Sequence, residues 1–334
     1  MATHLLVGNP TAQSGRNQER IARALELLRE AGLDAALLPT LPAGATVAAV
    51  RAALADTNVA VVIAMGGDGT FREVAAGLFT SPAKDRVALA MLPTGTANDQ
   101  GRSFGLQSTP DALERNVNVI REAHETWLDV GVHRSGPGVE PDYFFDSAGW
   151  GLSARVLAQR NKDRAFVETL GPLKELYRDH AVYVGAFLKT FLASYVVDDE
   201  MHVLAVLDGV PVELHGLTDL IVKNTRVYAG AWVFDPTSAH DDGAFELVPF
   251  RGKLDWTSKA IVDLDGNPIT ESMLNGIGVE HSKPLRARKI ELTIHGPLGG
   301  VPLAAQLDGE EWPVSPTITI EVVHRGLRLI VPRT

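Results

Sequence analysis

The first third of the chain alternates between continuous apolar runs and segments with apolar residues at helical spacing. Residues 59–65 and 87–92 are continuous apolar runs, which is typical of strands in a parallel sheet covered on both faces. Residues 18–30, 46–54 and 71–79 instead show a helical period. This order of signals predicts a doubly wound, mostly parallel sheet with helices on both faces.

From about residue 127 the pattern changes to short strands separated by turns. The expected strands cover 126–132, 143–148, 201–207, 217–223, 244–249, 289–294, 317–323 and 327–331. Asp208-Gly209 and Asp308-Gly309 are hairpin-type turns, and a helical stretch at about 172–195 interrupts the strands. We therefore expect an α/β domain over residues 1–127 and an antiparallel β-sandwich domain over residues 128–325, with a C-terminal tail that can return to the first domain.

Composition and charge restrict the class of protein. With 334 residues, 45% of them hydrophobic and 22% charged, the chain has the composition of an ordinary globular protein. A net charge of −10 argues against nucleic acid as a partner, and the lack of cysteine excludes disulfides and thiol catalysis. The first residues predict no secretory signal, and Lys189 interrupts the longest apolar stretch, 181–197. We expect a soluble cytoplasmic enzyme and leave peripheral membrane contact open.

Each of the two apolar runs ends in a glycine turn, GGDGT at 66–70 and PTGTAND at 93–99. The carboxyl ends of neighbouring parallel strands meet at one sheet edge, so we expect the two turns to lie side by side. Their backbone N–H groups and the following helix starts would form a phosphate cradle. A carboxylate repels phosphate, so the expected role of Asp68 is to bind Mg²⁺ or to handle a proton. A plain strand–turn–helix connection capped by Asp68 is the alternative.

The second turn also carries polar side chains suited to a ligand. Asn98 offers a donor and acceptors for a neighbouring loop or a ribose, and Arg102, about one helical turn later, is placed to meet phosphate charge. The alternative for Asn98 and Asp99 is an Asx turn with a helix cap.

The two glycine motifs and Arg102 together resemble the catalytic domain of the diacylglycerol kinase and sphingosine kinase superfamily, in particular its soluble bacterial lipid kinases. Residues 9–16 are similar to that family's first nucleotide loop, although a residue or two longer than its shortest versions. Further segments resemble the family in order along most of the chain: 145–151, 224–232, Pro236, 241–243 and the late DGE turn within 307–310.

The resemblance implies a kinase that uses ATP and Mg²⁺ to phosphorylate a lipid hydroxyl, within phospholipid metabolism. It implies a phosphofructokinase- and NAD-kinase-like nucleotide-binding domain, a β-sandwich lipid-substrate domain and an active site in the cleft between them. The residues implied to line the nucleotide are Asn9, Thr11, Gly66, Gly67, Gly69, Thr70, Gly95, Thr96, Asn98 and Arg102. Asp68 would organise Mg²⁺, and Asp242, or Asp241 in its place, a second structural Mg²⁺. Glu310 and Asp68 compete for the role of catalytic base.

Several alternatives stay open at this level. Asp308-Gly309 and 241–243 also fit plain turns, and the basic residues Lys283, Arg286, Arg288 and Lys289 fit either an anionic-lipid contact or one wet strand edge. Gln100 stands where the family commonly has an aromatic residue, which predicts a wider, more polar cleft mouth. NAD kinase activity and a non-catalytic nucleotide or lipid sensor are the rival functions. The lipid acceptor, a homodimer and the role of 254–285 are not decided by the sequence.

Overall fold

The computed structural model describes residues 2–10, 16–55, 58–95, 98–136, 138–159, 200–229, 232–233, 235, 238–251, 261–262, 284–296 and 303–333. The expected helix at 172–195 and most of the segment 254–285 lie outside these residues.

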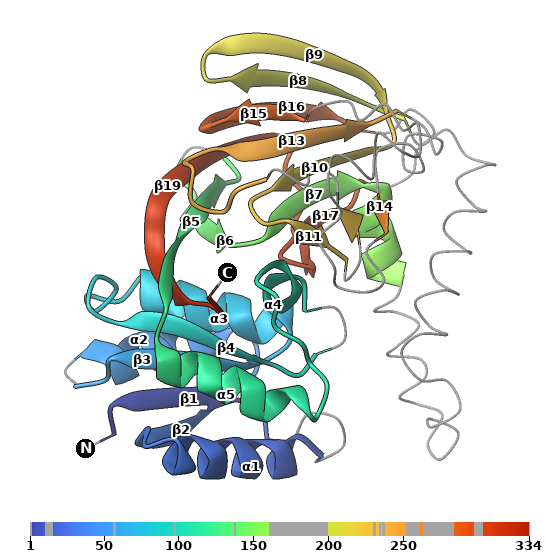
Figure 1. Cartoon of the computed structure of the whole chain (residues 1–334). Helices are drawn as coiled ribbons and strands as arrows, with labels where there is room; N and C mark the ends of the chain where they lie inside the picture. Colours follow the sequence, from blue (N-terminus) through green and yellow to red (C-terminus); the bar gives the residue numbers. More distant parts are fainter. Residues whose placement is uncertain are drawn as a thin grey trace.

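The first half is a parallel sheet covered by helices on both faces (Figure 1). Its strands, in the order β2-β1-β3-β4, are β1 His4–Gly8, β2 Ala35–Pro39, β3 Val61–Gly66 and β4 Ala88–Pro93. Its helices are α1 Arg16–Glu30, α2 Ala45–Ala55, α3 Asp68–Phe79, the short α4 Asp99–Ser103 and α5 Ala112–Glu122. Alternate residues of each strand point to opposite faces. Val62 therefore packs with α2 and α3, whereas Ile63 packs with α1 and α5.

In the second half, a six-stranded sheet packs face to face against the later strands of the large sheet that is described below. The six-stranded sheet has the order β15-β13-β10-β7-β17-β18, and a small third sheet has the order β11-β12-β14. The strand bounds are β7 Ser147–Gly151, β10 Asp219–Lys223, β11 Val227–Tyr228, β12 Trp232–Val233, β13 Phe245–Phe250, β14 Ile261–Val262, β15 Leu285–Ala287, β17 Ala305–Leu307 and β18 Glu310–Trp312. Trp150, Phe245, Ile290 and Ile320 belong to one buried cluster between the layers. The predicted fold class is confirmed.

The large sheet is continuous between the two halves. It runs β2-β1-β3-β4-β19-β16-β8-β9, with β5 paired to β19 and β6 to β5. The remaining bounds are β5 Glu125–Arg134, β6 Asp142–Phe144, β8 Met201–Leu207, β9 Val210–Leu217, β16 Lys289–His295 and β19 Thr317–Ile330. β19 lies parallel to β4 at one end and antiparallel to β16 and β5. The C-terminal segment thus returns to the first sheet, and residue 127 falls inside β5, while the exact domain limits stay a prediction.

The two strands expected at 317–323 and 327–331 form one strand, β19, with an irregularity between Val323 and Leu327. The buried carboxylate of Asp129 on β5 holds this irregularity. It accepts hydrogen bonds from Arg325 N at 2.6 Å and Gly243 N at 2.6 Å, and its Oδ1 lies 3.1 Å from His324 Nδ1. The interruption in the apolar pattern therefore marks a bulge and not the end of a strand.

Among the described residues, the helices lack the combination of length and hydropathy that a bilayer span requires.

Candidate active site

The two glycine turns meet at the carboxyl edge of the parallel sheet. β3 and β4 are neighbours with Gly66 opposite Pro93, and Gly66 O accepts hydrogen bonds from Thr94 N at 2.8 Å and Gly95 N at 3.3 Å. A Cβ atom added to Gly67 would lie 3.3 Å from Gly95 Cα, so the two backbones are in direct contact. The predicted juxtaposition of the two turns is confirmed. Side chains larger than glycine would separate them.

The first turn leads directly into α3. Gly67 is the residue before the helix, and the first helical hydrogen bond runs from Phe71 N to Gly67 O at 3.0 Å. The N–H groups of the first helical turn precede that bond and have no acceptor within the helix, so they offer donors and positive dipole character to an anion. The side chain of Thr70 folds back over Gly66, where it occupies the position that a Cβ atom would take.

Asn98 closes the second turn. It has a left-handed backbone conformation with φ of 52°, its Oδ1 accepts a hydrogen bond from Gly95 N at 3.0 Å, and its Nδ2 donates to Gly95 O. Of the two roles predicted for this amide, the structure shows the fixing of a loop. The next residue, Asp99, is buried and accepts a hydrogen bond from Ala229 N at 2.6 Å, which ties α4 to the second half of the chain.

Asp68 lies half-buried beside two buried carboxylates, Asp146 and Asp308. Its Oδ1 is 3.4 Å from the donor Gln100 N. Asp68 lies where the two glycine turns meet, a place that we call the crevice. Burial there, together with the negative charges of Asp146 and Asp308, raises the pKa of Asp68 from 3.8 to about 7. A cation beside Asp68 would relieve this repulsion. Because Asp68 is not sealed inside the core, such a cation can reach it.

The two neighbouring carboxylates already have protein partners. Asp146 Oδ1 lies 2.7 Å from Lys223 Nζ and accepts a hydrogen bond from the Thr225 hydroxyl. Asp308 accepts hydrogen bonds from the backbone N–H groups of residues 145, 146 and 147, at 2.9, 2.7 and 3.0 Å. These contacts fix both groups in place, so they act as scaffold and as a source of negative potential around Asp68.

The hairpin of β17 and β18 delivers Glu310 to the first glycine turn. Asp308 and Gly309 form its tight turn with φ values of 49° and 74°, and Leu307 pairs with Glu310. A Cβ atom added to Gly69 would lie 2.7 Å from Glu310 Oε1, so this carboxylate lies directly against the start of α3. The two acidic residues of the hairpin therefore have different roles. Asp308 is buried and holds the turn in place, whereas Glu310 is exposed and faces the crevice.

The family model of the diacylglycerol kinase catalytic domain matches residues 3–133. A "Probable lipid kinase YegS-like" from Chromohalobacter salexigens is 32% identical over 252 residues, which are 75% of this chain and 71% of the relative. This chain belongs to the diacylglycerol kinase catalytic-domain family. The diacylglycerol kinase of Bacillus subtilis is 28% identical over 308 residues, 89% of this chain and 90% of the relative. A solved structure of a diacylglycerol kinase from Bacillus anthracis shares the fold, with a TM-score of 0.70, 22% identity and coverage of 99% of this chain and 97% of that one.

Membership of the family confirms the resemblance found in the sequence and the prediction of a lipid kinase, which is a phosphotransferase. The assignment agrees with the geometry, because the first glycine turn contacts both Gly95 of the second turn and Glu310 of the late DGE turn.

The remaining predicted nucleotide residues lie at the same edge of the sheet or outside the described part of the chain. Asn9 follows β1, whose Gly8 pairs with Met65, so the register places Asn9 beside the first glycine turn. Arg102 lies on α4 and is partly buried. Thr11 and Thr96 are outside the described residues.

A pocket of about 220 Å³ opens next to this edge, lined by residues that include Arg20, Arg23, Met65, Pro93 and Thr94. The Arg20 guanidinium approaches Thr94 O at 3.5 Å.

Asp242 lies apart from the crevice, in the loop before β13. Its carboxylate pairs with Arg286 and accepts a hydrogen bond from Ala244 N at 3.1 Å. The predicted structural Mg²⁺ at Asp242 stays a prediction, and the guanidinium already supplies a counter-charge. The predicted basic patch is also partly neutralised, because Arg286 reaches Glu246 at 3.4 Å and Lys289 reaches Glu291 at 2.6 Å.

Gln100 differs from the expectation for a cleft mouth. Its side chain is only 2% exposed, and within the described part of the chain both atoms of its amide lack a hydrogen-bond partner. Gln100 on α4 is therefore buried and does not line an open entrance.

Sequence reasoning missed the supporting residues of the site. No role was predicted for Asp146, Lys223 or Arg72, although Asp146 lies in a segment that resembles the family. Arg72 lies 4.0 Å from Asp308 Oδ2, and its guanidinium stacks over the Trp312 ring at 4.2 Å. Both contacts join α3 to the late hairpin, a pairing of residues more than half the chain apart that no local pattern reveals.

Proposed function

We propose that this chain transfers the γ-phosphate of ATP to the hydroxyl of a diacylglycerol-like or sphingoid lipid, with Mg²⁺ held at Asp68. The observation that carries the proposal is the meeting of Gly67, Gly95, Asp68 and Glu310 in one crevice. Phosphoryl transfer needs positioning and charge neutralisation more than covalent assistance, and this arrangement supplies both.

The backbone of the two turns is the proposed phosphate site. N–H groups at the start of α3 supply the donors, and Gly95 packs against Gly67 there without an intervening side chain, while Gly95 N itself is bonded within the turns. The adjacent pocket offers apolar surface for the rest of a nucleotide, and Arg20 in its wall adds positive charge beside Glu19 and the ion-paired Arg23. Asn9 lies at the same edge.

The residues present fit Mg²⁺. Carboxylate oxygens and water are its preferred ligands, and Asp68 lies in a region of negative potential that makes its own ionisation costly. When bound, Mg²⁺ neutralises charge on the phosphate oxygens during transfer. The negative charges of Asp146 and Asp308 add to the attraction for the cation, and their hydrogen bonds fix the shape of the crevice.

Of the two candidate bases, the structure favours Glu310. Glu310 is exposed at the rim of the crevice, where an acceptor hydroxyl can arrive, whereas Asp68 lies deeper among like charges. We propose that Glu310 accepts the proton of the lipid hydroxyl and that Asp68 serves the cation. The lipid arrives by peripheral contact with a membrane, and the activity belongs to phospholipid metabolism.

The test is transfer of radiolabelled γ-phosphate from ATP into a total lipid extract, followed by identification of the labelled species. We expect Mg²⁺-dependent labelling of a lipid and none with Asp68→Asn. Parallel reactions with NAD as acceptor test the rival NAD kinase activity. ATP binding without transfer to any lipid or to NAD would overturn the proposal, as would full activity of Asp68→Asn.

A further inference from the structure

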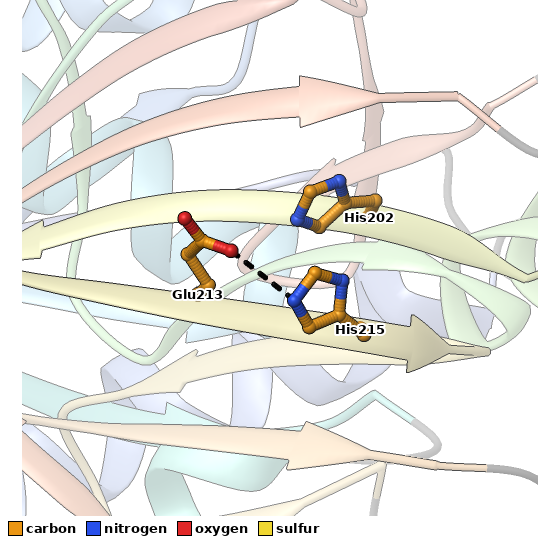
Figure 2. A group of neighbouring side chains, drawn as sticks. All are labelled: His202, Glu213 and His215. Carbon is orange, nitrogen blue, oxygen red and sulfur yellow. Dashed lines mark ion pairs between the residues drawn. The ribbon is translucent and has the colours of Figure 1, made fainter.

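The β8–β9 hairpin, at the outer end of the large sheet and far from α3 in Figure 1, carries a cluster of potential metal ligands. One ligand atom from each of His202, Glu213 and His215 lies within 4.8 Å of the others. Figure 2 shows the three side chains gathered on one face of the hairpin. They play no part in the phosphotransfer site.

A bulge brings the two imidazoles together. Met201 pairs with Leu217 and Val203 with Leu214, so His215 and Gly216 together oppose His202. Gly216 has a φ of 65°, a left-handed conformation that suits glycine. The rings of His202 and His215 consequently stack with centroids 4.2 Å apart and an interplanar angle of 22°.

The carboxylate of the cluster comes from the same strand as one imidazole. Glu213 and His215 are two residues apart on β9 and therefore share its outer face, whereas Leu214 between them is buried. Glu213 Oε2 lies 3.2 Å from His215 Nε2. Glu200 adds negative charge nearby, since a Cβ atom on Gly216 would lie 3.4 Å from its Oε2.

A second observation is that one potential ligand atom of the cluster lacks a hydrogen-bond partner. His202 Nε2 is shielded from solvent and has no hydrogen-bond partner among the described residues. A shielded polar atom without a partner is costly, and a metal ion is one way to satisfy it. His295 is the cross-strand neighbour of His202 on β16, with ring centroids 5.7 Å apart, so imidazoles line three adjacent strands at this place.

We propose that His202, Glu213 and His215 bind a divalent transition-metal ion, for which Zn²⁺ is the best match. Two neutral imidazoles and a carboxylate are typical zinc ligands, whereas Mg²⁺ and Ca²⁺ prefer oxygen alone. The ion would clamp the edge strand β9 to β8 across the bulge. Because β9 ends the sheet, the clamp would oppose fraying of its unpaired side.

The test is Zn²⁺ binding by isothermal titration calorimetry to the EDTA-treated full chain, in buffer with excess Mg²⁺ to occupy oxygen-rich sites. We expect saturable binding that weakens by more than about tenfold in His202→Ala and in His215→Ala. His124→Ala, which removes an exposed histidine on another part of the surface, is the matched control and should bind like the unmodified chain. Glu213→Gln changes only an exposed side chain, so it remains informative if a histidine variant folds poorly.

Substitution of Co²⁺ for Zn²⁺ gives an independent readout, because its visible absorption bands report nitrogen ligands and coordination geometry. We expect these bands in the unmodified chain and their loss in His215→Ala. Absence of Zn²⁺ binding by the unmodified chain would overturn the proposal. Unchanged binding by His215→Ala and Glu213→Gln would do the same, as would an equal loss in His124→Ala.

Discussion

Replacement of Asp68 by asparagine should stabilise the folded chain while it removes phosphoryl transfer. Folding places this carboxylate in a crevice that already contains Asp146 and Asp308, and its pKa rises from 3.8 to about 7. A raised pKa means that the ionised group is less stable in the folded chain than in the unfolded chain. Asparagine keeps the shape of the side chain and carries no charge to desolvate.

The magnitude follows from the pKa difference. The change from 3.8 to about 7 corresponds to about 4 kcal/mol of free energy of unfolding. Asp68 is half-buried and water screens part of the repulsion, so we expect a gain of about 1–2 kcal/mol for Asp68→Asn above pH 7. Between pH 3.8 and about 7 the unfolded chain has released this proton and the folded chain keeps it. The free energy of unfolding of the unmodified chain therefore falls across this window relative to the variant.

Urea unfolding of both proteins at several pH values, without Mg²⁺, measures this difference. It should be close to zero near pH 4 and reach its full value above pH 7. Asp85→Asn, at an exposed position, is the control and should change the free energy of unfolding by less than about 0.5 kcal/mol. Saturating Mg²⁺ should stabilise the unmodified chain and leave Asp68→Asn unchanged. A variant that is less stable at every pH, or a difference independent of pH, would refute the reasoning.

Three further substitutions test the rest of the site. Gly95→Ala puts a Cβ atom 2.5 Å from backbone of the other glycine turn and should reduce ATP-dependent turnover at least about tenfold, whereas Gly296→Ala, with nothing within 4 Å, should be neutral. Glu310→Gln should lower kcat about 100-fold with little change in the KM for ATP, and a change in KM alone would contradict its role as base. Lys223→Met leaves the buried Asp146 without its ion-pair partner and should cost about 3–5 kcal/mol in urea unfolding; a loss below about 1 kcal/mol would show that the pair is dispensable.

The glycine turns were predictable because their geometry is a local consequence of the sequence. Two apolar runs of strand length, each followed by glycines, can satisfy the backbone only as buried parallel strands with tight turns at their carboxyl ends. Neighbouring strands then bring Gly67 and Gly95 together. The late hairpin was likewise visible in Asp308-Gly309, although the place of Glu310 in the active site came from the resemblance and not from spacing.

The supporting residues Asp146 and Lys223 could not be predicted from the sequence, for a physical reason. Asp146 and Lys223 form a buried ion pair between β10 and the segment before β7, and neither flanking pattern distinguishes a buried charge from an exposed one. The continuity of β19 was hidden in the same way. His324 and Arg325 look like the end of a strand, and the carboxylate that accommodates them, Asp129, lies 196 residues before Arg325.

The unbroken course of β19 has a mechanical consequence. The same strand pairs with β4 of the first half at Leu329 and with β16 of the second half at Ile320. The two halves are therefore joined by a paired β-strand and not by a flexible linker. A movement that separates the two halves must bend β19. The strand is weakest at the kink formed by the bulge beside Asp129, where hydrogen bonds to a carboxylate replace those between strands. Nucleotide entry and product escape should accordingly depend on the stiffness of that kink.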